Sequence, residues 1–240
     1  MSEVLLEARD LEKRFGGVRA IAGVDFRLNR GELRCLIGPN GAGKSTFFKM
    51  LTAQLRPSSG RILFEGRDIT ALEPQRISRL GIGIKNQVPS VFDGIPVYEG
   101  LWLAAASRHP GAEAAGIVSE ILERLDLGGI SDHLVGTLAH GQRQWVEFGM
   151  VMALRPKLIL LDEPTAGMSH DEVKRTAELI RELNREAALI VVEHDMQFIR
   201  DIAATVTVFH QGRILMEDTM ANVQKDPKVR EIYMGTAADA

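Results

Sequence analysis

Hydrophobic and polar positions alternate along the first thirty residues, which is typical of half-buried β-strands. Val24, Phe26 and Leu28 are separated by polar residues, so their side chains fall on one face of an extended chain. The alternation predicts one strand at residues 18–28 and another at 4–15, with a two-glycine turn between them. The chain is therefore expected to begin with an antiparallel pair.

Short, continuous apolar runs predict a second kind of strand, which is buried on both faces. Three such runs are bounded by polar residues and lie at 33–37, 158–161 and 189–192. Two further strands are expected to form a closing hairpin around Gln211-Gly212, at 206–209 and 213–216.

Helical spacing of apolar residues dominates most of the remaining segments. Helices are predicted at residues 44–55, 101–107, 117–127 and 172–185. Strands that alternate with helices imply a mostly parallel sheet. The helical stretch at about 88–154 is expected to be an insertion into a single domain of residues 1–240, whose core comprises about 1–87 and 155–240.

A glycine-rich loop follows the first buried strand and opens a helix. It fits the pattern G-x-x-x-x-G-K-[ST] in full as Gly38-Pro39-Asn40-Gly41-Ala42-Gly43-Lys44-Ser45. The glycines let backbone N–H groups face an anion, and the helix N-terminus adds partial positive charge. We expect Lys44 to contact the β- and γ-phosphates of a nucleotide and the Ser45 hydroxyl to bind Mg²⁺. Alone, the loop does not separate a kinase, a GTPase and a transport ATPase, and a ligand-free glycine turn is the alternative.

Two carboxylates end the second buried strand. Asp162 and Glu163 follow the apolar run at 158–161, and in open α/β sheets ligands lie at the carboxyl ends of the strands. We expect Asp162 to reach Mg²⁺ through a water and Glu163 to orient and deprotonate an attacking water. Without the phosphate loop, solvated acids at a strand end would be the default interpretation.

Composition argues against several classes of protein. The 240 residues are 45% hydrophobic, with a formal net charge of −3, which argues against a protein that grips nucleic acid electrostatically. The single cysteine, Cys35, lies in an apolar run and is expected to be buried. No apolar stretch is long enough to span a bilayer, and the N-terminus lacks the basic region of a signal peptide. Any membrane role is therefore expected to come through a partner.

Further motifs resemble those of the ABC ATPase family. Leu138-Ala139-His140-Gly141-Gln142 resembles the family's L-S-G-G-Q signature and lies shortly before the acidic strand end, as in that family. Gln87 resembles the Q-loop glutamine, Ala166-Gly167-Met168-Ser169 the D-loop, and His194 the switch histidine. Phe15 occupies the place of the aromatic residue that stacks on adenine. The resemblance covers nearly the whole chain, with the motifs in the family's order.

The resemblance implies a fold, an activity and its cofactors. The fold would be α/β, with a P-loop NTPase core around a mostly parallel sheet, an N-terminal antiparallel β subdomain and an inserted helical subdomain. The activity would be ATP hydrolysis with ATP and Mg²⁺. Glu163, His194 and Gln87 would be catalytic, and Ser45, Gln87 and Asp162 would bind the metal.

Nucleotide contacts would come from two chains. In one chain, the residues expected to bind ATP are Phe15, Gly38, Pro39, Asn40, Gly41, Ala42, Gly43, Lys44, Ser45 and Thr46. The signature residues of a second ATPase subunit would contact the same nucleotide, namely Ala139, His140, Gly141 and Gln142. This second site is best used in trans because each chain already has a phosphate loop, and Gly141 begins a helix whose free N–H groups attract an anion.

The weaker motifs have ordinary alternatives when each is taken alone. His194 would then be a structural histidine, Gln87 a common loop residue and Phe15 a core side chain. The signature also departs from the family pattern. Ala139 replaces the serine, which removes one hydroxyl donor, and His140 replaces the first glycine. We expect weaker contacts in trans or slower turnover, but not a dead enzyme, because backbone donors are still present.

Finer features resemble the ATPases of branched-chain amino acid and urea uptake systems. These are His140, Trp145, the D-loop at 165–168 and the tail at 226–235. The resemblance implies permease partners, an indirect link to a solute-binding protein, a peripheral position at the cytoplasmic face of the membrane and no nucleic acid. A soluble ABC ATPase acting on DNA or ribosomes and a nucleotide sensor without hydrolysis are the rival hypotheses.

The segment after Gln87 is expected to contact the permease. Residues 88–103 carry many large apolar side chains, including Phe92, Tyr98 and Trp102, and two prolines that interrupt regular structure. A loop with so many apolar groups suggests a partly exposed patch. Since it adjoins Gln87, a shift there would move the helical insertion and the permease together.

Overall fold

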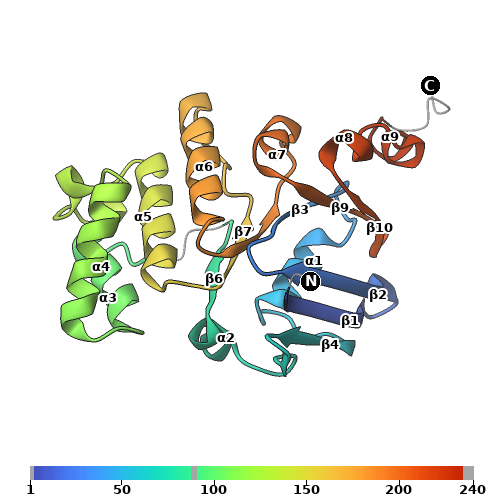
Figure 1. Cartoon of the computed structure of the whole chain (residues 1–240), viewed down its shortest axis with the longest axis horizontal. Coiled ribbons are helices and arrows are strands. Elements are labelled where there is room, and N and C mark those ends of the chain that lie inside the picture. Colours follow the sequence, from blue (N-terminus) through green and yellow to red (C-terminus); the bar gives the residue numbers. More distant parts are fainter. Residues whose placement is uncertain (1–2, 88–90, 235–240) are drawn as a thin grey trace.

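The computed structural model of the chain describes residues 3–87 and 91–234 and contains two β-sheets (Figure 1). The first sheet is antiparallel, with the strand order β2-β1-β4-β5. Its strands are β1 (Val4–Phe15), β2 (Val18–Asn29), β4 (Ser59–Phe64) and β5 (Arg67–Asp68). The antiparallel N-terminal pair predicted from the alternating pattern is confirmed.

The second sheet has six strands in the order β10-β9-β3-β8-β7-β6. They are β3 (Leu33–Ile37), β6 (Ile82–Lys85), β7 (Leu158–Asp162), β8 (Ala188–Val192), β9 (Thr205–His210) and β10 (Arg213–Asp218). Neighbouring strands are parallel except for β10, which pairs antiparallel with β9. The predicted parallel sheet and closing hairpin are therefore confirmed.

A group of helices lies at one end of the molecule, on the left in Figure 1. It comprises α3 (Val97–Ala106), α4 (Gly111–Arg124), α5 (His140–Ala153) and two 3-10 turns, Gly128–Ile130 and Val135–Thr137. We call α3, α4 and α5 the helical insertion. These helices fall within the segment that the sequence marked as an insertion.

Helix α3 occupies the second part of the segment that was expected to be an apolar loop. Residues 88–90 lie outside the described part of the chain, but α3 begins at Val97, directly after Pro96. Proline favours this place because its fixed φ suits the start of a helix. Val97 and Leu101 are four residues apart and fully buried, so the apolar residues follow a helical face. Helical spacing therefore prevailed over the two prolines that had suggested a loop.

All four predicted helices have different ends in the structure; α3 begins at Val97 rather than 101, and α4 at Gly111 rather than 117. Helix α1 spans Lys44–Leu51 and stops before residue 55, because Ala53 takes a positive φ of 56°. Helix α6 spans His170–Leu183 and starts two residues early. Ser169 caps it, since its hydroxyl accepts from the Glu172 N–H, while the Glu172 carboxylate accepts from the Ser169 N–H at 2.8 Å.

Four helices and two strands of the structure were not predicted from the sequence. They are α2 (Pro74–Leu80), α7 (Met196–Ile202), α8 (Met220–Val223) and α9 (Pro227–Met234), together with β5 and β6. None of the helices within residues 3–87 and 91–234 is both long enough and apolar enough to cross a bilayer.

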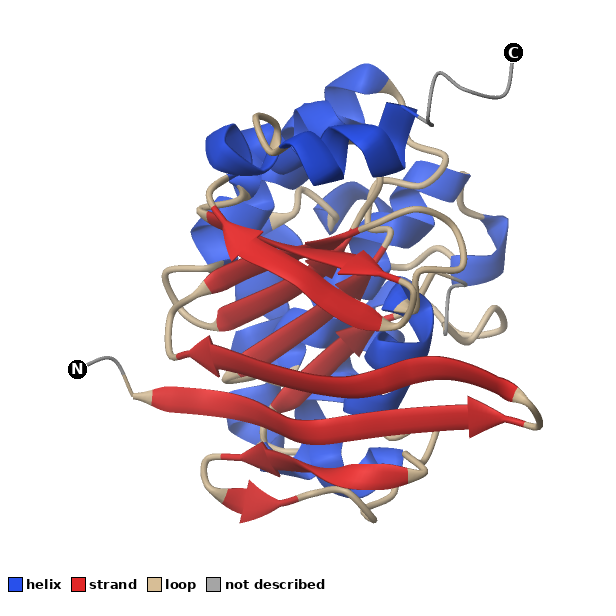
Figure 2. Ribbon diagram, turned by 90° about the vertical axis from the view of Figure 1, so that its right-hand side faces the viewer, coloured by secondary structure: helices blue, strands red, loops and turns tan. Residues whose placement is uncertain are grey.

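Two apolar clusters cover the two faces of the six-stranded sheet. Helix α1 and the antiparallel sheet cover one face, where Leu158 and Leu160 point. The helical insertion, α6 and α7 cover the other, where Ile159 and Leu161 point. Alternate residues of one strand thus enter different clusters. Figure 2 shows the strands of both sheets toward the viewer, with most helices behind them. Cys35 of β3 is fully buried, as predicted.

Candidate functional site

The glycine-rich loop connects β3 to α1 and is shaped by close backbone approaches. A Cβ on Gly38 would lie 2.3 Å from the carbonyl oxygen of Phe209, so no larger residue fits there. Gly43 takes a φ of 107°, and a Cβ on it would lie 2.8 Å from the carbonyl oxygen of Ala20. The loop curls around Lys44, whose Nζ donates to the carbonyl oxygens of Gly38 at 2.6 Å and Pro39 at 3.1 Å.

The charge of Lys44 is held close to two carboxylates. Burial lowers the pKa of Lys44, while the nearby Glu163 and Asp162 oppose that effect. A tightly curled glycine loop, an ammonium group inside it and the N-terminus of α1 behind it form an anion site. The residues present therefore fit the polyphosphate of a nucleotide.

Asp162 and Glu163 stand at the carboxyl end of β7, as the sequence predicted. Burial raises the pKa of Asp162, and the neighbouring charge of Glu163 raises it further. Glu163 has a positive φ of 47°, and its N–H donates to the carbonyl oxygen of Val192 at 2.9 Å. The backbone therefore turns sharply after Asp162 and directs the Glu163 side chain toward the neighbouring strand ends.

Gln87 and His194, which the sequence analysis selected separately, both lie beside Glu163. The side-chain amide of Gln87 donates to the Glu163 carboxylate at 2.8 Å. The Nδ1 atom of His194 lies 3.7 Å from the other carboxylate oxygen. Gln87 follows β6 and His194 follows β8, the two neighbours of β7. Parallel strands thus carry the amide, the carboxylate and the imidazole to one edge of the sheet.

Glu193 is a residue of this region that the sequence analysis did not single out. It is 1% exposed, and its carboxylate accepts from the backbone N–H of His194 at 2.8 Å and from the Thr165 hydroxyl. It therefore ties the backbone before His194 to the segment that leads into the D-loop. A charged residue closing an apolar strand, directly before a candidate histidine, was the signal that could have found it.

A pocket of about 520 Å³ opens between the glycine loop and these side chains. Its lining consists of Gly38, Pro39, Asn40, Glu163, His194, Ile232 and Tyr233. Five of the seven were predicted to bind nucleotide or to act on it. Ile232 and Tyr233 come from the C-terminal helix α9, which lies in the tail at 226–235 but was not predicted to line the nucleotide site.

Comparison with known proteins decides which family this arrangement represents. The family model described as "ABC transporter" matches residues 21–166, which is more than half of the chain. The chain belongs to the ABC transporter family. It is accordingly an ATP-binding subunit and an ATPase, and subunits of this family work as dimers with membrane permeases.

Three curated relatives of this ABC ATPase match it over nearly the full length of both chains. The branched-chain amino acid transport ATP-binding proteins BraF of Pseudomonas aeruginosa and LivG of Escherichia coli are both 32% identical to it, with 99% of this chain and all of each relative covered. The lipopolysaccharide export ATP-binding protein LptB of Acidithiobacillus ferridurans is 34% identical over 98% of both chains.

Solved structures of ABC cassettes have the same fold. The ADP conformation of MJ1267, an ATP-binding cassette of an ABC transporter, has a TM-score of 0.86 and 30% identity, covering 98% of this chain and all of that one. CbiO1 of Clostridium perfringens has a TM-score of 0.83 and 29% identity over 98% of this chain and 96% of its own. The predicted α/β fold with a P-loop NTPase core is therefore confirmed.

The residues of the ABC signature lie elsewhere in the fold. Ala139 and His140 begin α5, and neither lines the pocket that contains Glu163 and His194. The His140 Nε2 atom lies 3.2 Å from the carbonyl oxygen of Ala166, so the signature packs against the D-loop of its own chain. This arrangement leaves the trans role of the signature as a prediction.

Phe15 ends β1 and is 49% exposed, so it is not a core side chain. The Nζ atom of Lys13 lies 5.2 Å from the centre of its ring. Its exposed face is free to stack on a flat base, and its contact with adenine stays a prediction.

Donors for a magnesium ion are present at the strand ends. Ser45 is exposed at the start of α1, and Asp162 and Gln87 lie at the carboxyl ends of β7 and β6. Within residues 3–87 and 91–234, no group of three or more His, Cys, Asp and Glu side chains is placed to hold a metal ion. One hydroxyl, one carboxylate and one amide nevertheless fit a cation that retains several waters and binds phosphate oxygens.

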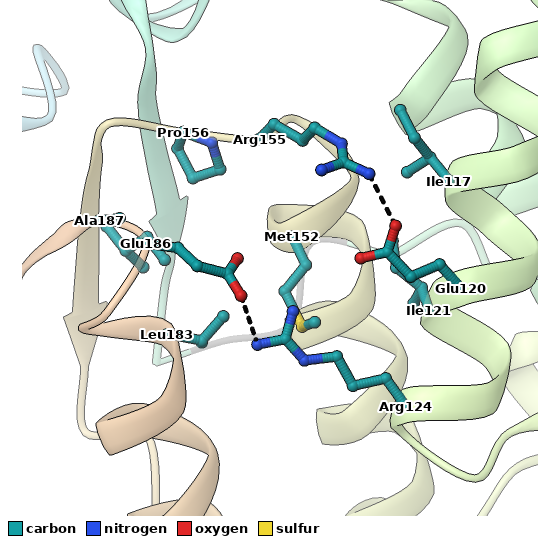
Figure 3. A pocket seen from close by; sticks show the side chains of 11 residues that line it. Ile117, Glu120, Ile121, Arg124, Met152, Arg155, Pro156, Leu183, Glu186 and Ala187 are labelled. Atoms are coloured by element: carbon teal, nitrogen blue, oxygen red, sulfur yellow. Dashed lines mark hydrogen bonds and ion pairs between the residues drawn. The ribbon is translucent and has the colours of Figure 1, made fainter.

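A separate pocket of about 280 Å³ lies where the helical insertion meets the core (Figure 3). Arg124 of α4 forms ion pairs with Glu182 of α6 at 2.9 Å and with Glu186 just beyond that helix at 3.0 Å. Arg155 pairs with Glu120 at 2.7 Å on the other side of the pocket. The charged walls of this pocket are thus already paired, and we assign it no ligand.

Proposed function

We propose that the chain powers uptake of branched-chain amino acids, urea or a related small polar solute. The observation that carries this proposal is the full-length match to BraF and LivG, whose names state branched-chain amino acid transport. In this proposal the chain binds ATP at the cytoplasmic face of the membrane, beside a permease supplied with solute by a binding protein. No nucleic acid takes part.

The site geometry supports a mechanism in which Glu163 is the general base. Its carboxylate accepts a proton from the attacking water, and a positioned base typically contributes about 10²- to 10⁴-fold in rate. The Gln87 amide, 2.8 Å away, fixes one carboxylate oxygen and leaves the other for the water. His194 is 72% exposed, so its ring is free to turn from Glu163 toward the γ-phosphate.

The cofactors of the proposal are ATP and Mg²⁺. Lys44, the neighbouring loop amides and Thr46 would hold the phosphates, and Phe15 would stack on adenine. Ser45, Asp162 and Gln87 would hold Mg²⁺, which supplies positive charge to the phosphates when bound. The raised pKa of Asp162 supports this assignment, because a buried carboxylate beside a second acid is relieved by a nearby cation.

The second half of the ATP site would come from a second ATPase subunit. Ala139, His140, Gly141 and Gln142 lie outside the pocket of their own chain, which supports their use in trans. With alanine at position 139, contacts to the γ-phosphate would rest on backbone N–H groups at the start of α5. This arrangement closes two nucleotides between two subunits, identical or not.

Helix α3 and the segment before it form the proposed contact with the permease. Their large apolar side chains leave much of their surface in water, with exposed fractions of 67% for Phe92, 40% for Tyr98 and 36% for Trp102. Val97 and Leu101 pack inward, so the outer face of α3 is distinct from its core face. Charged substitutions at Tyr98 and Trp102 should uncouple transport while leaving ATP binding by the isolated subunit intact.

Purification from native membranes in mild detergent tests the proposal. We expect a polytopic permease to accompany the tagged chain, and proteoliposomes containing the complex to take up labelled leucine or urea when ATP is present on the ATPase side. Crosslinks from positions 92–103 should reach the permease. Recovery of a lipopolysaccharide exporter, which the similarity to LptB allows, would contradict uptake. Crosslinks confined to the tail after Asp226 would contradict the docking site.

Lys44→Ala provides the matched control for these experiments. It removes the ammonium group from the phosphate loop, and a hydrogen bond to a charged group contributes about 1.5–3 kcal/mol. ATP affinity measured by titration should therefore fall by about 10- to 150-fold, with loss of uptake. Unchanged affinity would count against the assignment of the loop.

A further inference from the structure

The C-terminal helix α9 is anchored to the core by its first turn. The Asp226 carboxylate accepts from the backbone N–H groups of Lys228 at 2.9 Å and Val229 at 3.0 Å, which caps the helix. Val229 is 5% exposed and belongs to the apolar cluster on the insertion face of the sheet. The direction in which α9 runs is therefore fixed, and its last turn reaches the phosphate loop.

Two residues of that last turn close the nucleotide pocket. Ile232 and Tyr233 line the same cavity of about 520 Å³ as Gly38, Glu163 and His194. The backbone of Gly38 faces the Tyr233 hydroxyl and acts to lower its pKa, as an N–H directed at the oxygen does. The C-terminal helix thus forms one wall of the pocket that also contains Glu163 and His194.

The chemistry of the Tyr233 hydroxyl suits a phosphate neighbour. Burial of the hydroxyl raises the pKa of Tyr233 to about 12, although 37% of the residue stays exposed, so the phenol is neutral at physiological pH. A neutral phenol has one O–H to donate and can accept as well. Because the oxygen faces the N–H of Gly38, its own hydrogen is left to donate to an anion in the pocket.

We propose that Tyr233 is a nucleotide-contacting residue, which donates a hydrogen bond at the γ-phosphate end of ATP and thereby couples α9 to the presence of that phosphate. The inference rests on the proposed function, since it requires ATP in this pocket. The Tyr233 hydroxyl needs a phosphate oxygen beside Glu163 and His194, and ADP has no γ-phosphate to supply one. Tyr233 therefore distinguishes ATP from ADP.

The tyrosine content of the chain makes a direct spectroscopic test practical. The chain has two tyrosines, Tyr98 on α3 and Tyr233 on α9, so ¹³C labelling of the tyrosine rings gives two sets of resonances. The set lost in Tyr233→Phe identifies Tyr233, and Tyr98 serves as the internal reference. The spectra are recorded with the Glu163→Gln chain, which preserves ATP during the measurement, in the presence of Mg²⁺ and either ATP or ADP.

We expect the Tyr233 resonance to move on addition of ATP and to take a different position with ADP, while the Tyr98 resonance stays in place. In parallel, Tyr233→Phe should weaken ATP about two- to tenfold, the range of one neutral hydrogen bond. ADP affinity should be nearly unchanged, and an unaltered Tm of the ligand-free variant would show that the fold is intact.

Three results would overturn the inference. If ATP binds but the Tyr233 resonance does not move, the hydroxyl is not at the nucleotide. If Tyr233→Phe weakens ATP and ADP equally, the residue only supports the phosphate loop. If neither nucleotide binds to the Glu163→Gln chain, the proposed function fails and this inference fails with it, a result that titration distinguishes from the first two.

Discussion

The two faces of the six-stranded sheet are stabilised in different ways. On the face that carries α1, aromatic rings interlock: Phe47 lies with its ring centre 5.4 Å from that of Phe26 and 5.2 Å from that of Phe209. This face also has a buried cation, Arg34, but its partners Glu32 and Glu217 reach solvent, with side-chain exposures of 15% and 36%. On the face that carries the helical insertion, the apolar cluster encloses an ion pair in which both partners are buried. Lys85 of β6 and Glu147 of α5 lie 3.3 Å apart, with side-chain exposures of 0% and 7%.

The insertion face also contains two pockets where the helices meet the core. The 280 Å³ pocket opens between α4, α5 and α6, and one of about 170 Å³ lies beside Lys85 and Glu147. Close aromatic packing on the α1 face holds the phosphate loop in one geometry. Since ion pairs and pockets separate the insertion from the core on the other face, we expect the insertion to move more easily than the loop. We therefore predict that the phosphate loop stays in place during turnover and that the insertion moves.

The largest effect on ATP hydrolysis is expected from substitution of Glu163, which follows strand β7. Glu163→Gln keeps the volume of the side chain but cannot accept a proton from water. Hydrolysis should fall by about 10²- to 10⁴-fold, with ATP binding retained. The ATP-bound dimer should then accumulate on gel filtration. Near-normal turnover in a phosphate-release assay would refute the role of Glu163 as the general base.

The next largest effect concerns the buried pair on the insertion face. Lys85→Met takes away the cation that faces Glu147, and breaking a buried ion pair costs about 3–5 kcal/mol. Joint replacement, Lys85→Met with Glu147→Leu, should recover most of that stability in urea unfolding.

The exposed pair between Lys157 and Glu65, 2.8 Å apart, provides the control. Lys157→Met should cost less than about 1 kcal/mol. If Lys85→Met is as stable as this control, the buried Lys85–Glu147 pair contributes no more than an exposed pair. The proposed difference between the two faces of the sheet would then lack its main support.

A moderate effect is expected at Phe15, which lies outside both clusters. Stacking of a base on an aromatic side chain contributes about 1–3 kcal/mol in nucleic-acid binders. Phe15→Ala should weaken ATP and GTP by similar factors, because a ring face does not read the base. Equal affinities before and after the substitution, measured by calorimetry, would leave Phe15 without a role in binding.

The smallest effect is expected at Arg124, which joins the insertion to the core. Its partners Glu182 and Glu186 are half exposed or more, and such pairs are worth about 0.2–1 kcal/mol. Arg124→Ala should therefore barely change Tm, yet speed hydrogen exchange at the junction of α4 and α6. Arg143→Ala is the matched control, because Arg143 and its partner Asp93 both lie within the inserted segment at 88–154. Equal exchange in both variants would mean that Arg124 does not restrain the insertion.

The residues of the phosphate loop and the acidic strand end could be predicted because local sequence determines them. A buried strand, a glycine pattern and a helix start place Lys44, and a strand end places Asp162 and Glu163. The convergence of Gln87 and His194 on Glu163 followed from the parallel order of strands whose ends they share.

The rest depended on contacts between distant segments. β6 was missed because its run of four residues contains Gly83 and ends in Lys85, a charged residue that looks like the end of a strand. Lys85 is buried only because Glu147 faces it from another element. Tyr233 was missed for the same reason, since nothing near it in the sequence points to Gly38.

The burial of Cys35 makes this chain well suited to site-specific labelling. Cys35 is the chain's one cysteine, it has no exposed surface, and burial raises the pKa of its thiol, so the reactive thiolate does not form at neutral pH. A maleimide dye or spin label would therefore react with cysteines introduced at the surface and not with the native one. A pair of such labels, one on α4 and one on α6, would report the distance between insertion and core during turnover, without any change to the interior of the sheet.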